Sequence, residues 1–172
     1  MEKGENHAQF FTATILEWKH LLKQDRYKDI LIESLRYLVR EKRVIIYAFV
    51  IMPNHIHLIW HIQPGHNRPA VQRDFLKFTA QQMRFDLLKT DPVMLQEFEV
   101  NAKDRRYQFW ERNALSVDLY TERIFIQKLD YIHANPVQEH WKLCKYPENY
   151  KYSSAGFYHS GTIGWDFLTH FR

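Results

Sequence analysis

The hydrophobic and polar positions of this chain follow two periods, one typical of strands and one typical of helices. Apolar, aromatic and β-branched residues fill residues 10–15, 44–51 and 55–62, which we expect to be strands. Apolar residues recur at steps of three and four over residues 26–41 and again over residues 70–89. Both of these segments should therefore form amphipathic helices.

The second half of the chain carries weaker signals. Pro92 ends the second helix, and residues 98–100 and 107–110 are short strand candidates on either side of a basic loop. A third helix should begin after the N-cap residue Thr121 and end near Ala134, because a proline follows soon after. The order strand, helix, strand, strand, helix, strand, helix predicts an α+β ferredoxin-like sandwich. We expect a mainly antiparallel sheet of four to five strands with helices packed on one face.

The length of 172 residues favours a single domain over the whole chain, 1–172. We expect its core to span about residues 8–137. The C-terminal extension, residues 138–172, is too aromatic for a free linker and should pack on that core.

Composition narrows the class of protein. With 45% hydrophobic and 26% charged residues, the chain is an ordinary globular protein rather than a disordered or membrane one. It has no apolar run that could span a bilayer and no signal-peptide core, so we expect a cytoplasmic protein without a membrane partner. Its single cysteine, Cys144, excludes an internal disulfide. The net charge of +4 favours an anionic partner.

Two histidines stand one residue apart in the third predicted strand. Because side chains alternate along a strand, His55 and His57 should point to one face while Ile56 and Leu58 point to the other. The preceding Pro53 and its neighbours supply a turn, so the pair opens the second strand of a hairpin. The spacing alone leaves two interpretations open: half of a metal site, or a half-buried strand with a polar face.

The third predicted helix offers a partner for this pair. Tyr131 and Asn135 are four residues apart and share a face with Gln127 and Lys128, one turn earlier. Two imidazoles and an amide oxygen leave open positions on a divalent ion such as Mg²⁺ or Mn²⁺, which suits phosphoryl transfer. A nearby metal or cation would also make a tyrosine a better nucleophile. The alternative is that Tyr131 is an ordinary helix tyrosine whose hydroxyl contacts water.

Two motifs carry a family resemblance. Residues 47–60, with the sequence YAFVIMPNHIHLIW, resemble the HUH motif of the single-tyrosine transposases. Residues 131–137, with the sequence YIHANPV, resemble the nucleophile helix of that family, and this motif is closest to its REP-associated branch. The resemblance spans about residues 8–137.

The resemblance implies roles for four residues. His55 and His57 would be metal ligands, Asn135 would take the position of the third ligand, and Tyr131 would be the nucleophile. It also implies a ferredoxin-like or palm fold, a Mg²⁺ or Mn²⁺ cofactor, and a single-stranded DNA substrate recognised through a hairpin. The products would be a 5′-phosphotyrosine link and a free 3′-hydroxyl. Relatives act as homodimers or as monomers, and the sequence leaves both open.

Basic residues outside these motifs are candidates for contacts with the DNA backbone, although without the family resemblance a solvated surface is the favoured interpretation of the basic stripe on the second helix. These residues are Arg73, Lys77, Lys103, Arg105, Arg106 and Lys128. Two other functions compete with a transposase. A catalytically silent binder of single-stranded or hairpin nucleic acid would use the same basic and aromatic surface. A phosphoesterase that uses water as its nucleophile is disfavoured, because the sequence lacks the carboxylate cluster of two-metal nucleases.

Overall fold

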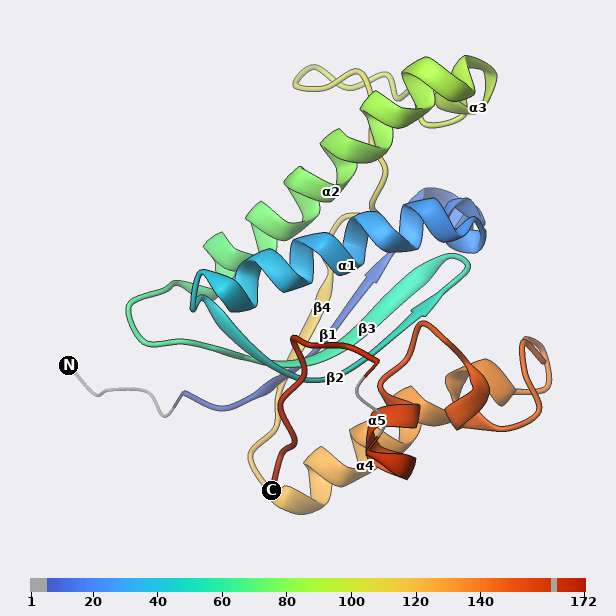
Figure 1. Cartoon of the computed structure of the whole chain (residues 1–172). Coiled ribbons are helices and arrows are strands. Elements are labelled where there is room, and N and C mark those ends of the chain that lie inside the picture. Colours follow the sequence, from blue (N-terminus) through green and yellow to red (C-terminus); the bar gives the residue numbers. More distant parts are fainter. Residues whose placement is uncertain (1–5, 162–163) are drawn as a thin grey trace.

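A computed structural model describes residues 6–161 and 164–172, and its centre is a four-stranded antiparallel sheet of order β2-β3-β1-β4 (Figure 1). The strands are β1 (Gln9–Thr14), β2 (Val44–Met52), β3 (His55–Ile62) and β4 (Leu115–Asp118). The helices are α1 (Asp25–Arg40), α2 (Arg68–Thr90), α3 (Pro92–Gln96), α4 (Glu122–Ala134) and α5 (Ala155–Ser160). Short 3-10 turns are η1 (Leu16–Trp18), η2 (Leu21–Lys23), η3 (Asn135–Val137) and η4 (Pro147–Asn149).

Local sequence signals set several of these boundaries. The two residues Pro53 and Asn54 form the tight turn between β2 and β3. The side chain of Asn67 caps α2 by accepting a hydrogen bond from the backbone N–H of Ala70 at 3.1 Å. The hydroxyl of Thr121 caps α4 in the same way. These caps fix where the helices begin relative to the sheet.

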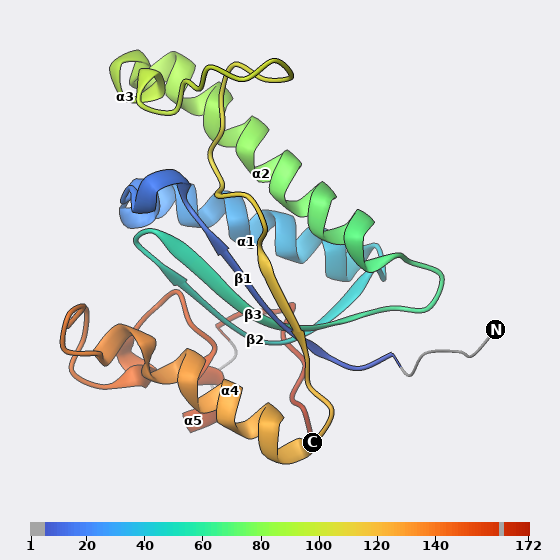
Figure 2. The same cartoon turned by 180° about the vertical axis from the view of Figure 1, so that it is seen from behind.

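The strand order is that of two interlocked β-α-β units, in which β1 lies between β3 and β4. Because such crossover connections are right-handed, α1 and α2 pack side by side on the same face of the sheet (Figures 1 and 2). The side chains between these helices and the sheet are apolar and fully buried, with Phe11, Trp60 and Phe75 among the largest. This cluster is the main hydrophobic core.

The opposite face of the sheet is covered by α4. A second apolar cluster joins Phe125, Leu129 and Ile132 of this helix to Val50 and Ile59 of the sheet. Both cartoon views place α4 on the side of the sheet away from α1 and α2 (Figures 1 and 2). The sheet is therefore sandwiched between helices.

The C-terminal segment joins this second layer. The hydroxyl groups of Tyr150 and Tyr158 donate to the backbone carbonyls of Ile51 and Tyr47 in β2, at 2.7 and 2.9 Å. The backbone of Ser154 also pairs with Phe49. These contacts lie along the outer edge of β2, whose unpaired backbone groups would otherwise be exposed.

The structure confirms the predicted α+β class, the antiparallel sheet of four strands, the hairpin and the three long helices. The expectation that helices pack on one face is corrected, because α4 follows the β-α-β units and covers the other face. The strand candidates at residues 98–100 and 107–110 are also wrong. They contain only isolated bridges, Glu99 with Tyr107 and Ile15 with Trp110, and the fourth strand lies at residues 115–118 instead.

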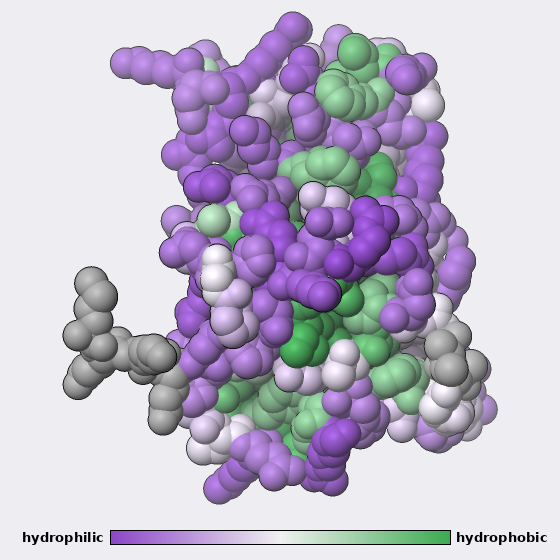
Figure 3. All heavy atoms as spheres, turned by 60° about the vertical axis from the view of Figure 1, so that its left-hand side comes forward, coloured by the Kyte–Doolittle hydropathy of each residue, from purple (hydrophilic) through white to green (hydrophobic). Residues whose placement is uncertain are grey.

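The surface carries both hydrophilic and hydrophobic side chains, as expected from a chain with 45% hydrophobic and 26% charged residues. Hydrophilic side chains predominate on the face drawn in Figure 3, and hydrophobic side chains gather in patches near its middle. Within residues 6–161 and 164–172, no helix is both long and apolar enough to cross a membrane.

His133 links α4 to the C-terminal segment, and its burial predicts a dependence of stability on pH. Its Nε2 lies 2.8 Å from the hydroxyl of Ser154, and burial lowers the pKa of His133 to about 4. An unfolded histidine titrates near 6.5, so the unfolded state binds more protons below that pH and the free energy of unfolding falls between about pH 6.5 and 4. In urea unfolding, the wild type should lose about 2 kcal/mol more than His133→Gln between about pH 7.5 and 5. Equal losses in the two proteins would contradict this assignment.

Candidate active site

A cavity of about 770 Å³ lies between the sheet and the C-terminal end of α4. Strands β1 and β3 contribute side chains to it, as do the residues after β1 and the segment that follows α4. Four of the residues singled out from the two motifs line this cavity together: His55, His57, Tyr131 and Asn135. The structure therefore brings the two motifs to one place within a single chain.

The two histidines lie on the same face of β3, as the alternation predicts. His57 stands opposite Thr12 of β1 and Val50 of β2 in the antiparallel register. The rings of His55 and His57 have centroids 4.6 Å apart and planes at 69°. Only 8% and 5% of these two residues is exposed, so both imidazoles are held by packing rather than by water.

Each imidazole has a partner at its Nδ1 atom. His55 Nδ1 lies 2.6 Å from the side-chain oxygen of Asn54, and His57 Nδ1 lies 2.7 Å from the hydroxyl of Thr12. Because the amide oxygen can only accept, it assigns the proton of His55 to Nδ1 and leaves a lone pair on Nε2. The hydroxyl of Thr12 can accept from His57 in the same way. This is how protein metal ligands are usually oriented by their outer partners.

The electrostatic setting favours neutral imidazoles. Burial lowers the pKa of His55 to about 4, against a smaller raising effect of its side-chain hydrogen bond with Asn135. Burial, together with the neighbouring His55 and the Lys128 cation, lowers the pKa of His57 to about 3. At neutral pH both rings are therefore uncharged, which is the form that binds a metal ion.

The helical spacing of α4 explains the other half of the site. Phe125, Leu129 and Ile132 form the buried stripe, so Lys128 and Tyr131 lie beside it at the edge of the cavity. The Tyr131 ring lies 5.3 Å from the His57 ring at an angle of 66° and is 48% exposed. A tyrosine in this position is ordered by its neighbours and open to a ligand.

Two further contacts tie α4 to the site. The Nζ atom of Lys128 lies 5.6 Å from the centroid of the Tyr131 ring and 4.7 Å from that of Phe10. Asn135, at the end of α4, is 5% exposed and hydrogen-bonds to His55 through its side chain. The α-helix ends at Ala134, and the turn η3, which contains Pro136, begins at Asn135.

The donor set fits a divalent metal ion only if Asn135 takes part. Among the residues that the structure describes, no group of three or more histidine, cysteine, aspartate or glutamate side chains is arranged to hold a metal. His55 and His57 supply two nitrogen donors, and the buried carboxamide of Asn135 contacts one of them. Nitrogen donors favour a transition ion such as Mn²⁺, because Mg²⁺ prefers oxygen ligands throughout.

Of the six basic residues predicted to contact DNA, only Lys128 lines the cavity. Arg73 and Lys77 lie on α2, on the other side of the sheet, and Arg73 pairs with the adjacent Asp74. Lys103, Arg105 and Arg106 lie in the segment between α3 and β4. There Asp104 and Glu99 neutralise the two arginines. Their contacts with DNA stay predictions, and these five side chains do not line the cavity.

Several residues in or beside the cavity escaped the sequence analysis. Thr12 follows Phe10 in the alternation of β1, but nothing in the sequence pairs that strand with the histidine strand. Asn54 belongs to the predicted turn, and nothing in that turn marks it as the partner of His55, which follows it. Trp18 and Trp141 line the same cavity from segments without regular strands or long helices.

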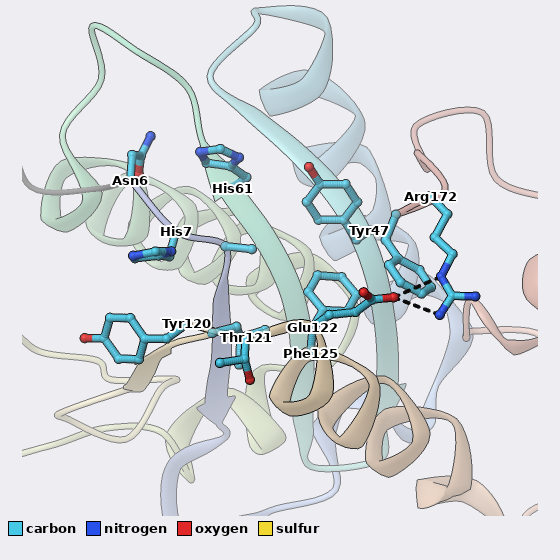
Figure 4. A pocket seen from close by; sticks show the side chains of 12 residues that line it. Asn6, His7, Tyr47, His61, Tyr120, Thr121, Glu122, Phe125 and Arg172 are labelled. Atoms are coloured by element: carbon cyan, nitrogen blue, oxygen red, sulfur yellow. Dashed lines mark hydrogen bonds and ion pairs between the residues drawn. The ribbon is translucent and has the colours of Figure 1, made fainter.

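A second pocket, of about 460 Å³, lies at the other end of α4 (Figure 4). Tyr120, Thr121 and Glu122 line it from the start of the helix, and Arg172 closes one side through an ion pair with Glu122 at 2.8 Å. None of the predicted site residues, all of which the structure describes, lines this pocket. The predicted chemistry is confined to the first cavity.

Comparisons with known proteins agree with this arrangement. No protein-family model and no curated protein matches the sequence. A solved REP-associated tyrosine transposase, bound to a REP hairpin, superimposes with a TM-score of 0.66 at 19% identity, over 93% of this chain and 82% of that one. A Deinococcus radiodurans R1 protein provisionally named a transposase matches with a TM-score of 0.48 at 18% identity, over 77% of this chain and 94% of that one. This weaker likeness adds nothing to the assignment.

The resemblance first seen in the two motifs is thus matched by the whole architecture. The superposition covers 93% of the chain, far more than the two motifs alone. The chain has the fold of a REP-associated tyrosine transposase.

Proposed function

We propose that this protein is a transposase of the single-tyrosine HUH type that nicks and rejoins single-stranded DNA beside a hairpin. The observation that supports it most directly is the meeting of Tyr131 with the histidine pair, at a ring separation of 5.3 Å, in one cavity of one chain. The fold similarity to a hairpin-bound transposase supports the same substrate class. The net charge of +4 suits a polyanionic partner. We expect this activity in the cytoplasm.

In this proposal His55, His57 and Asn135 hold a Mg²⁺ or Mn²⁺ ion. When bound, such an ion polarises the scissile phosphate and offsets the charge that develops on it. Thr12 and Asn54 orient the two imidazoles so that each presents Nε2. Burial keeps both rings neutral and ready to coordinate.

Tyr131 supplies the nucleophile. Its phenolic oxygen attacks the phosphorus and gives up its proton to water, and the bond from phosphorus to the 3′-oxygen breaks. The 3′-oxygen takes up a proton from water and leaves as a hydroxyl group. The products are a 5′-phosphotyrosine ester and a free 3′-hydroxyl, which can reverse the step on another strand end. The Lys128 cation beside the ring favours the negative charge that develops on the attacking oxygen. Because nucleophile and histidines belong to one chain, nicking needs no second subunit, whether or not the protein also forms a homodimer.

The first test removes the nucleophile. With Mn²⁺ and a labelled hairpin oligonucleotide, the wild type should retain a covalent DNA adduct after denaturation, and Tyr131→Phe should retain none. Because the ring stays, hairpin binding in a gel-shift assay should change less than about threefold. Tyr146→Phe, at an equally exposed tyrosine that does not line the cavity, is the matched control and should form the adduct normally.

The outcomes separate the competing functions. An adduct that persists in Tyr131→Phe would refute the nucleophile assignment. Cleavage without any adduct in the wild type would favour a phosphoesterase that uses water. Binding without cleavage on every hairpin tried would favour a silent nucleic-acid binder.

The second test addresses how the imidazoles are oriented. Thr12→Val keeps the shape of the side chain but removes the oxygen beside His57 Nδ1, so Mn²⁺ affinity should fall about 10- to 100-fold. Thr14→Val, on the same face of β1 and lining the same cavity, is the control and should change the affinity little. Titration of Mn²⁺ followed by electron paramagnetic resonance measures both. Equal affinities in the two variants would show that Thr12 does not position His57.

A further inference from the structure

Among the residues that the structure describes, Trp18 is the most exposed tryptophan, with 64% of its area open to solvent. It lines the cavity that holds the histidine pair and Tyr131. An indole is a large apolar surface, and its natural place in a folded chain is the interior or an interface. Its exposure in the wall of this cavity favours a contact with a flat ligand.

The backbone that carries this indole is in an unfavourable conformation. Glu17 and Trp18 are consecutive residues with positive φ, 54° and 59°. Residues other than glycine rarely adopt this backbone conformation, and backbone strain of this kind is found most often at functional sites. A glycine would fit position 18 without strain, so the conformation alone does not call for tryptophan.

Neighbouring segments hold this turn in place. Trp18 donates its backbone N–H to the carbonyl of Ile15 at 2.9 Å, and Glu17 donates to a carboxylate oxygen of Glu111 at 2.5 Å. The side-chain amide of Asn54 donates to the carbonyl of Trp18 at 3.4 Å, and its oxygen is the partner of His55 Nδ1. One side chain therefore joins the backbone of Trp18 to the candidate metal site.

We propose that Trp18 is a stacking platform for an unpaired base of the DNA strand that enters the active site. This inference rests on the proposed function, because it takes single-stranded DNA as the ligand of the cavity. The next base along such a strand lies beside the phosphate that Tyr131 would attack. An exposed indole there binds any base by its flat face and holds that phosphate in register.

The experiment compares DNA ligands of equal charge. One hairpin oligonucleotide carries a single-stranded extension of thymidines, and the other carries an extension of abasic sites. Binding is measured in Tyr131→Phe protein without added metal, so neither cleavage nor a metal is needed. The protein with Trp18 should bind the thymidine extension about 5- to 100-fold more tightly, as expected for one stacked base. Adding Trp18→Gly should abolish this preference, and Trp18→Phe should keep most of it.

The glycine variant separates binding from folding. Since glycine relieves the positive φ, Trp18→Gly should melt at or above the temperature of its parent. Tyr120→Ala is the matched control: Tyr120 is 66% exposed but lines the pocket at the other end of α4, so the thymidine preference should survive its loss. As a measurement that needs no variant, 4-thiothymidine in the extension should photo-crosslink to Trp18.

A folded Trp18→Gly protein that keeps the full thymidine preference would overturn the inference. A crosslink pattern confined to other residues would do the same. Because these measurements ask nothing of Tyr131 chemistry, they can succeed while the adduct test fails, and that combination would leave a single-strand binder without nuclease activity. Adduct formation together with an unchanged preference in Trp18→Gly would retain the transposase and reject the platform.

Discussion

The packing of α4 against one face of the sheet is the constraint on which the rest of the site depends. Phe125, Leu129 and Ile132 bury themselves on that face, and the axis and rotation of the helix follow from this contact. The neighbouring face of the helix, which carries Lys128 and Tyr131, then lies at the edge of the cavity that holds His55 and His57. A change in the buried stripe would move the phenol and the amide together, away from the imidazoles.

The periodicities of the sequence predict the two halves of the site but not their meeting. Alternation along β3 places both histidines on one face, and helical spacing places Tyr131 with Asn135. Both are local properties that a few neighbouring residues determine. That α4 covers the face holding the histidines is a property of the whole fold, and only the chemistry of Tyr131 and Asn135 and the family resemblance suggested it.

Other features escape the sequence for identifiable reasons. Strand β4 is an edge strand of only four residues, none of which is fully buried. Its sequence therefore shows little of the apolar alternation that predicts a strand. The roles of Thr12 and Asn54 depend on strand register and on a turn, so no motif marks them. Hydrogen bonds from distant segments hold Trp18 at a positive φ, and a tryptophan in the amino-acid sequence does not predict that conformation.

The features that the sequence does not predict lie in or beside one cavity, and the residues there lower the stability of the fold. Burying two imidazoles lowers their pKa values to about 4 and 3, because their charged forms would lose hydration, so the folded state loses stability as the pH falls below about 6.5. The adjacent turn stores backbone strain as well. An apolar residue at position 57 would remove a buried imidazole, and a glycine at position 18 would relieve the backbone strain. Neither change would disturb the core on the other face of the sheet. The fold therefore gives up stability where the proposed chemistry requires neutral metal ligands and a displayed ring, and Asn54 joins the two by binding His55 and Trp18 at once.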